Sequence, residues 1–255
     1  MRPLHFTAPN FALALAALAS LTSGCFGNDP LGLDGDWSNG ERNNTQWQIG
    51  DGLCPGLSGG CALNVPIAVG VETTFSVEGV RSATPTVSSP ANTRNVTIGG
   101  DAENQRATIT FTTTAPGSAR FVISDETGEV DAATIQVRQP TRLECGLITT
   151  ENEPRWDIGG FTFPASAAVP FESATEIARM HSLACRTSDA TGPLLSGGAI
   201  GWTIVEGTAL SLNDDDFNTA TIRGAHIHYT TLSRGTVQLT ATFGELSDTF
   251  NVTVD

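Results

Sequence analysis

The sequence lacks lysine and is poor in positive charge. All 13 of its basic residues are arginine, against 27 aspartates and glutamates, so the formal net charge is −14 at pH 7. A strongly acidic surface is repelled by phosphate backbones and by anionic lipid headgroups. The charge therefore argues against a nucleic-acid partner, and it excludes electrostatic attraction as the means of holding this protein at a membrane.

Long hydrophobic runs are also missing. The apolar segment near the N-terminus, Phe11–Leu21, has 11 residues, whereas a membrane-spanning helix needs about 20 to cross roughly 30 Å of hydrocarbon. A short apolar run behind a weakly basic start, here Arg2 and His5, is the form of a secretory signal peptide. We therefore expect residues 1–24 to direct export rather than to span the membrane.

The apolar run ends in Leu21–Cys25, with the sequence LTSGC. This segment resembles the lipobox of bacterial lipoproteins, in which a branched apolar residue and two or three small residues precede a cysteine. The resemblance implies that Cys25 carries diacylglycerol and becomes the first residue of a mature chain anchored to a membrane. The family usually has leucine three positions before the cysteine, where this sequence has Thr22. The competing interpretation is ordinary cleavage near Ser23, which would leave Cys25 as an unmodified thiol.

The residue after the lipobox bears on which membrane holds the lipid. In enterobacterial lipoproteins an aspartate at this position favours retention in the inner membrane, and this sequence has Phe26 there. The resemblance thus implies a lipid-anchored protein of the cell envelope, located in the outer membrane and facing the periplasm or the exterior.

Four further cysteines make an even set: Cys54, Cys61, Cys145 and Cys185. Exported proteins occupy compartments in which disulfides persist, and four cysteines allow three pairings. The economical pairing closes a small loop between Cys54 and Cys61. It leaves Cys145 and Cys185 to pair within a second domain. A zinc site is the alternative, but the paired CxxC or Cys/His spacings that it needs are absent from the sequence, and we expect no cofactor.

The segment after the lipobox is rich in glycine, asparagine and aspartate and shows no apolar periodicity, which predicts loop or disorder. We therefore expect a flexible tether over 25–62, followed by domains over 63–140 and 141–255. Trp37 and Trp47 interrupt the tether. Packing back on the first domain is the favoured interpretation of these side chains, and exposure for a partner is the alternative.

Beyond residue 62 apolar side chains alternate with small or polar ones, many of them threonine. The alternation covers residues 65–77, 107–111, 119–123, 135–137, 200–204, 237–243 and 250–254. A period of two in valine, isoleucine and threonine marks half-buried strands, and the glycines between the segments mark turns. Gly244-Glu245 is a predicted hairpin turn. The fold class predicted is all-β, with two tandem sandwiches.

The two predicted domains end alike. Gly117–Ile123 and Gly235–Ala241 each have a glycine followed by alternating apolar residues, then a turn and a last strand that ends at Val137 or Val254. This is an internal repeat of roughly 115 residues. It resembles the final hairpin of bacterial immunoglobulin-like (BIG-type) domains, where a G-T-A-T-V-T-A run precedes a strand ending in V-T-V. The resemblance implies a Greek-key β-sandwich, a spacer or adhesion role and no catalytic residues.

Two groups of side chains are weak candidates for a metal site. His226 and His228 lie two residues apart in a predicted strand, so both point to one face. A metal would need a third ligand, for which His181 is the candidate, and two surface histidines on a strand is the favoured interpretation. The run Asn213–Asp216 lacks the alternating ligands, the glycine and the distal glutamate of a calcium loop, so it is interpreted as an acidic turn.

The sequence therefore predicts a cell-envelope lipoprotein that acts as a non-catalytic interaction or spacer module. Its partners would be the membrane, through the lipid, and an envelope protein or glycan. The alternative is a ligand-binding accessory lipoprotein for a glycan or a divalent metal. A hydrolase is least favoured, since no catalytic constellation in the sequence stands out from background.

Overall fold

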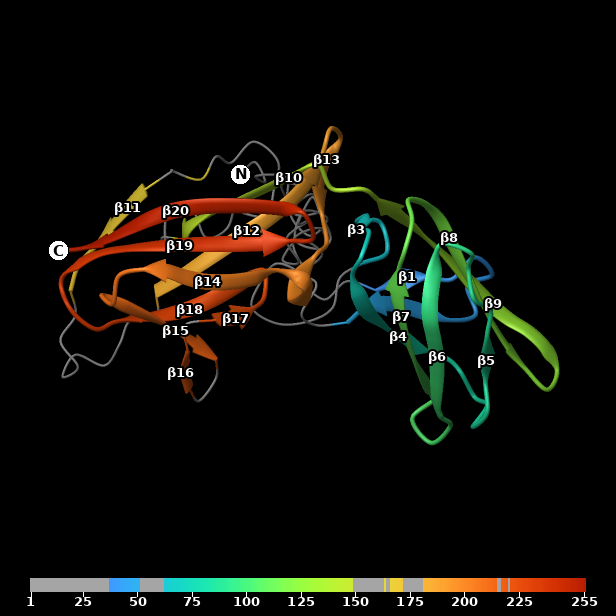
Figure 1. Ribbon diagram of the computed structural model, residues 1–255. Coiled ribbons are helices and arrows are strands. Elements are labelled where there is room, and N and C mark those ends of the chain that lie inside the picture. The colour runs from blue at the N-terminus through green and yellow to red at the C-terminus, as the bar shows by residue number, and fades with distance from the viewer. Residues whose placement is uncertain are drawn as a thin grey trace, which may run out of the picture. The chain divides into compact units, whose positions relative to one another are not determined.

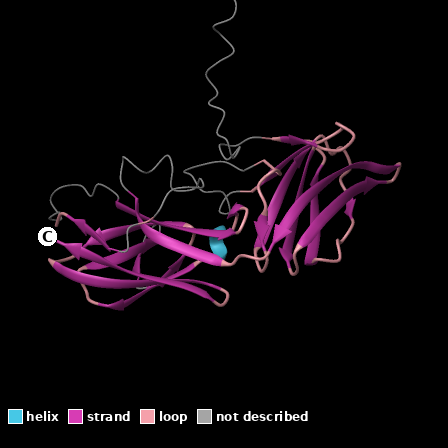
Figure 2. Ribbon diagram, turned by 90° about the horizontal axis from the view of Figure 1, so that it is seen from above, coloured by secondary structure: helices cyan, strands magenta, loops and turns pink. Residues whose placement is uncertain are grey.

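The structure is a computed structural model that describes residues 37–50, 62–148, 163, 166–171, 181–214, 217–219 and 221–255. The described residues are nearly all in strands or turns, with one short 3-10 helix, η2 (Gly197–Ala199) (Figure 2). They contain no helix that is long and apolar enough to cross a membrane. The expected signal peptide and the cysteines at 25, 54 and 61 lie outside the described residues.

The first sandwich consists of two sheets (Figure 1). One has the strand order β1-β2-β4-β7-β6 and the other β3-β9-β8-β5. The strand bounds are β1 (Ser38–Asn39), β2 (Gln46–Ile49), β3 (Ile67–Ala68), β4 (Glu72–Glu78), β5 (Thr86–Val87), β6 (Thr93–Asp101), β7 (Arg106–Thr113), β8 (Gly117–Asp125) and β9 (Gly128–Arg138). Neighbouring strands are antiparallel, except that β3 runs parallel to β9.

The core of this sandwich follows from the alternation in its strands. In β4 the side chains of Thr73, Phe75 and Val77 are buried while those between them are half-exposed, as expected for a strand with one face on a core. Aromatic rings from three strands meet there. The ring centroid of Phe75 lies 4.7 Å from that of Phe111 and 5.2 Å from that of Phe121.

The second sandwich also has two sheets, ordered β10-β12-β18-β15-β16 and β11-β20-β19-β14-β17, with β13 paired to β12. The strand bounds are β10 (Arg142–Ile148), β11 (Ser166–Val169), β12 (His181–Asp189), β13 (Gly192–Leu194), β14 (Gly201–Glu206), β15 (Leu210–Asp214), β16 (Phe217–Thr219), β17 (Thr221–Arg223), β18 (His226–Thr231), β19 (Gly235–Phe243) and β20 (Leu246–Val254). β19 and β20 pair up to Phe243 and Leu246, so the predicted two-residue turn is present, and its Gly244 has the positive φ of 57° that such turns require.

Both sandwiches have the immunoglobulin strand order. In a constant-type immunoglobulin domain, strands A, B, E and D form one sheet and C, F and G the other. β2-β4-β7-β6 and β10-β12-β18-β15 correspond to A-B-E-D, while β5-β8-β9 and β14-β19-β20 correspond to C-F-G. The tandem immunoglobulin-like fold predicted from the internal repeat is therefore confirmed.

Part of the segment expected to be a tether belongs to the first sandwich. β1 and β2 lie within 25–62, and β2 pairs with β4 over its whole length. Trp47 is fully buried, with its ring edge-on to Phe75 at 6.0 Å, and its indole N–H donates to the hydroxyl of Thr45. The packing interpretation of Trp47 is confirmed. The tether prediction was wrong for residues 38–49, because a four-residue strand between polar turns shows too little periodicity to be recognised.

Candidate functional site

The two histidines singled out by the sequence lie on β18. His226 and His228 are half-buried on its outward face, while Ile227 between them is buried in the core. Their ring centroids are 5.0 Å apart. Ser182 of β12 pairs with His228 in register, and its hydroxyl oxygen lies 2.9 Å from His228 Nδ1.

Burial controls the protonation of His226. Removal of His226 from water, with a smaller contribution from the nearby His228, lowers the pKa of His226 to about 4. A neutral imidazole is the form that binds metals. Yet within the described part of the chain no three His, Cys, Asp or Glu side chains are grouped so that they could hold an ion. The backbone of His181, the expected third ligand, is paired with that of Tyr229 rather than with either histidine.

The acidic run is only partly described. Asn213 lies in β15, and its side-chain amide donates to the hydroxyl of Thr230 on β18 at 2.8 Å. Asp215 and Asp216 lie outside the described residues. On either side of them, β15 and β16 pair as antiparallel strands, with Asp214 opposite Phe217. The amide of Asn213 thus bonds to the neighbouring strand.

Cys145 of β10 and Cys185 of β12 lie directly opposite each other and form a disulfide, with their Cα atoms 4.1 Å apart. The Cys185 N–H donates to the carbonyl of Ala225 instead of to Cys145. The two cysteines are therefore a non-hydrogen-bonded pair, in which antiparallel strands bring side chains closest. The disulfide is buried in the core and fastens the edge strand β10 to its sheet.

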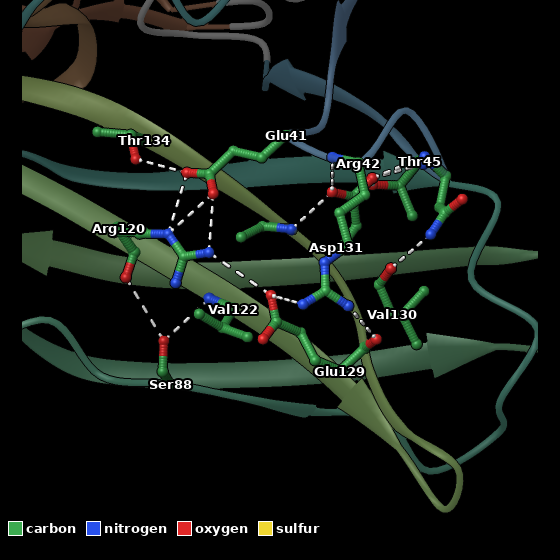
Figure 3. Close-up of polar contacts among 12 residues, drawn as sticks. Glu41, Arg42, Thr45, Ser88, Arg120, Val122, Glu129, Val130, Asp131 and Thr134 are labelled. Atoms are coloured by element: carbon green, nitrogen blue, oxygen red, sulfur yellow. Dashed lines mark hydrogen bonds and ion pairs between the residues drawn. The ribbon is translucent and has the colours of Figure 1, made fainter.

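A buried carboxylate that is not among the predicted site residues holds a loop of the first sandwich in place (Figure 3). Asp131 of β9 has no exposed surface. Its Oδ1 accepts the backbone N–H groups of Arg42 and Ala132, both at 2.8 Å. Its Oδ2 accepts the N–H groups of Asn44 and Thr45 at 2.8 and 2.9 Å, and the Thr45 hydroxyl at 3.0 Å. All of these donors except Ala132 belong to the loop between β1 and β2, so Asp131 and residues 40–45 together are named the first clasp.

The hydrogen bonds decide the charge of Asp131. Burial alone would raise the pKa of this carboxyl, because an ionised group is costly away from water. The pKa is nevertheless held below its usual range, because the backbone N–H groups of Arg42, Ala132 and Asn44 and the hydroxyl of Thr45 bind the ionised form. Asp131 is therefore a charged acceptor that holds the loop.

Charged side chains tie the same loop to β8 and β9 from outside (Figure 3). Glu41 accepts two N–H groups of Arg120 at 3.0 and 2.7 Å, and the hydroxyl of Thr134 at 3.0 Å. Arg42 pairs with Glu129 at 3.0 Å. Exposed ion pairs of this kind contribute at most about 1 kcal/mol each, so the buried carboxylate is the main contact.

The loop also covers the edge of β9. The Glu41 N–H donates to the carbonyl of Ala132 at 2.8 Å, and the side-chain amide of Asn44 donates to the carbonyl of Val130 at 2.9 Å. Gly40 leaves room for this approach, because a Cβ atom at that position would collide with the carboxylate of Asp131. Glycine is therefore required here by close approach.

One signal for the first clasp is visible in the sequence. Asp131 has the same parity along β9 as the buried residues Ala133, Ile135 and Val137. A carboxylate at a core-facing position demands hydrogen-bond partners. Those partners could not be identified from the pattern, because they lie 86 to 89 residues away in the chain.

Comparison with known proteins gives no family. No family model matches the sequence, and no curated protein matches it. Domains 5–6 of the S-layer protein SbsC match with 17% identity and a TM-score of 0.30, covering 75% of this chain and 94% of that one. The Yersinia pseudotuberculosis adhesin InvE matches with 14% identity and a TM-score of 0.26, covering 87% and 60%.

Invasin, described as a bacterial integrin-binding protein, matches with 13% identity and a TM-score of 0.30, covering 87% of this chain and 41% of that one. This chain therefore spans less than two thirds of the InvE and invasin chains. At such identities and TM-scores these similarities carry no function to this chain, and the immunoglobulin-like assignment depends on its own strand order.

Proposed function

We propose that this protein is a cell-envelope lipoprotein, anchored by a lipid on Cys25, whose two immunoglobulin-like domains serve as a non-catalytic interaction or spacer module. The proposal depends on one observation. The apolar run Phe11–Leu21 is followed at once by Thr-Ser-Gly-Cys, and this segment precedes two domains of the same strand order. A lipid anchor is effective because each buried CH₂ group contributes about 0.8 kcal/mol. The acidic surface gives no attraction of its own to anionic lipid.

The polar contacts within the domains support a scaffolding role. The ionised Asp131 bonds to a loop of its own domain. In the second domain Glu144 pairs with Arg142 at 2.7 Å and with Arg186 at 2.9 Å. Side chains engaged in this way stabilise the sandwiches, which suits a module that holds a partner at a distance from the membrane.

The anchor is tested by mass spectrometry of the mature N-terminus and by membrane fractionation. The unaltered chain should begin at an acylated Cys25 and sediment with membranes, whereas Cys25→Ser should be released as soluble protein. Thr22→Leu is the matched control: it supplies the leucine usual at this position of the lipobox and should keep the lipid. An unmodified Cys25 in the unaltered chain would refute the proposal. Separation of inner from outer membranes tests the expected outer-membrane location.

A further inference from the structure

The second sandwich contains an aspartate in the same position as Asp131. Asp131 lies six residues before Val137, and Asp248 lies six residues before Val254. In the sheets, Val137 pairs with Gly117 and Val254 with Gly235, the glycines that open the repeated hairpins.

Register confirms this equivalence. Asp131 pairs with Ile123 and Asp248 pairs with Ala241, and each of these partners is the sixth residue after its glycine. The two aspartates therefore occupy corresponding sites on the last strand of each sandwich. The five residues that follow each aspartate, 132–136 and 249–253, differ at every position between the two domains. The aspartate is therefore shared although the residues after it are not.

Each carboxylate also bonds to backbone near the start of its own domain. Asp131 of β9 accepts backbone N–H groups from the loop that joins the first strands of its sandwich, and Asp248 of β20 accepts the backbone N–H of Cys145 at 2.7 Å. Cys145 lies on β10, the first strand of the second sandwich and the edge of the opposite sheet. In both domains an aspartate on the last strand thus holds the backbone at the start of the domain. Asp248 with β10 is named the second clasp.

We propose that the two clasps are the elements that resist tension along the chain. The chain enters each sandwich through its first strand, and it leaves the first sandwich through β9, which carries Asp131. If the lipid holds Cys25 and a partner holds the second domain, any pull between them passes from residues 38–49 to β9. The first clasp bridges these two segments directly. This inference rests on the spacer role proposed above, which supplies the tension.

Clasps in this position act on the rate of unfolding. Forced unfolding is governed by the unfolding rate, which rises when interactions that must break before the transition state are weakened. Under tension applied at the N-terminus, the loop 40–45 cannot leave β9 until its bonds to Asp131 have broken. In the second domain β10 cannot separate from β20 until the bond between Cys145 and Asp248 has broken.

The test is single-molecule force spectroscopy on the full chain carrying Cys25→Ser, so that no lipid is attached and the result is independent of lipidation. Handles at the two termini give one unfolding event for each domain. The disulfide identifies the second domain, because the 40-residue separation of its cysteines withholds about 140 Å of extension at ~3.5 Å per residue. Reductant restores that length.

Asp131→Asn should raise the unfolding rate of the first domain at constant force by about tenfold or more, and Asp248→Asn should do the same for the second domain. Asp125→Asn is the matched control, because the half-exposed Asp125 carboxylate bonds within its own turn, to Thr127. It should change the rate less than twofold. Equal effects of Asp131→Asn and Asp125→Asn, or no effect of Asp248→Asn, would overturn the inference.

A second pulling geometry separates a mechanical role from general destabilisation. The N-terminal handle is moved to Asn104, in the turn between β6 and β7, and the C-terminal handle stays in place. Tension then no longer passes through the loop 40–45. Asp131→Asn should then change the unfolding rate of the first domain less than threefold, and an undiminished effect would refute the mechanical role.

If Asp131→Asn does not fold, Glu41→Gln weakens the same junction from outside. It should increase the unfolding rate two- to threefold with handles at the two termini, and not with the handle at Asn104. If the unaltered chain is lipidated but the Cys25→Ser chain shows none of these effects on pulling, the clasps are refuted and the proposed anchor stands.

Discussion

Replacement of Asp131 by asparagine is the most direct measure of what the first clasp contributes at equilibrium. The change keeps the shape of the side chain and one acceptor oxygen. The new NH₂ group must replace either Oδ1, which accepts from Arg42 and Ala132, or Oδ2, which accepts from Asn44 and Thr45. In both cases at least two backbone N–H groups face a donor instead of a carboxylate oxygen.

The expected loss follows from those two bonds. Hydrogen bonds to a charged group contribute about 1.5 to 3 kcal/mol each, which sets the gross loss at roughly 3 to 6 kcal/mol. Burial of a neutral amide costs less than burial of a carboxylate, and this offsets part of the loss. We expect a net destabilisation of about 3 kcal/mol, a large share of the roughly 5 to 15 kcal/mol typical of a domain.

A urea titration followed by tryptophan fluorescence gives the measurement, since Trp47 is buried beside the clasp. With a slope of about 2 kcal/mol per molar urea, the midpoint of the first domain should fall by about 1.5 M. Asp125→Asn should lie within about 0.5 kcal/mol of the unaltered protein, as surface substitutions do. An Asp131→Asn midpoint that coincides with this control would refute the reasoning that the buried carboxylate holds the loop.

Two further predictions concern crowding and protonation. Gly40→Ala should destabilise the first domain by about 1 to 3 kcal/mol in the same titration, because its Cβ would overlap the Asp131 carboxylate, although glycine-to-alanine changes at unstrained sites stabilise; a gain in stability would contradict the close approach. The His226 ring, with its pKa lowered to about 4 against 6.5 in the unfolded chain, stays neutral in the fold. The second domain should therefore be fully stable above pH 6.5 and lose on the order of 2 kcal/mol as the pH falls from 6.5 to 4. His226→Gln should remove that slope, and a slope unchanged by this substitution would contradict the burial of the ring.

The parts of the fold that sequence predicted are those encoded locally. The alternation in 237–243 and 250–254 with glycine between them defined the last hairpin, since side-chain period and turn chemistry act over a few residues. The likeness of Gly117–Ile123 to Gly235–Ala241 defined the tandem repeat. The disulfide between Cys145 and Cys185 was predicted from the even number of cysteines beyond Cys25 and from the most economical pairing, not from the geometry of the strands.

The parts that sequence did not predict depend on contacts between distant segments. β2 is stabilised as a strand by its pairing with β4 and by the burial of Trp47, and its own four-residue pattern is too short to predict it. Asp131 could be flagged by its core-facing parity, but its partners lie in a loop that has the composition of a polar linker. The histidine pair was located correctly on one face of a strand, whereas the place of His181, the expected third ligand, follows only from the register that pairs its backbone with that of Tyr229.

If the chain is exported as proposed, the length of chain between the two halves of each clasp has a consequence for the order of folding. A chain that emerges from a membrane with its N-terminus first presents residues 40–45 long before Asp131, so the first sandwich stays open until β9 has emerged. In the second domain Cys185 emerges 40 residues after Cys145 and well before Asp248. The disulfide can therefore be in place while β20 is still in transit, and the aspartate closes each domain as its last strand arrives.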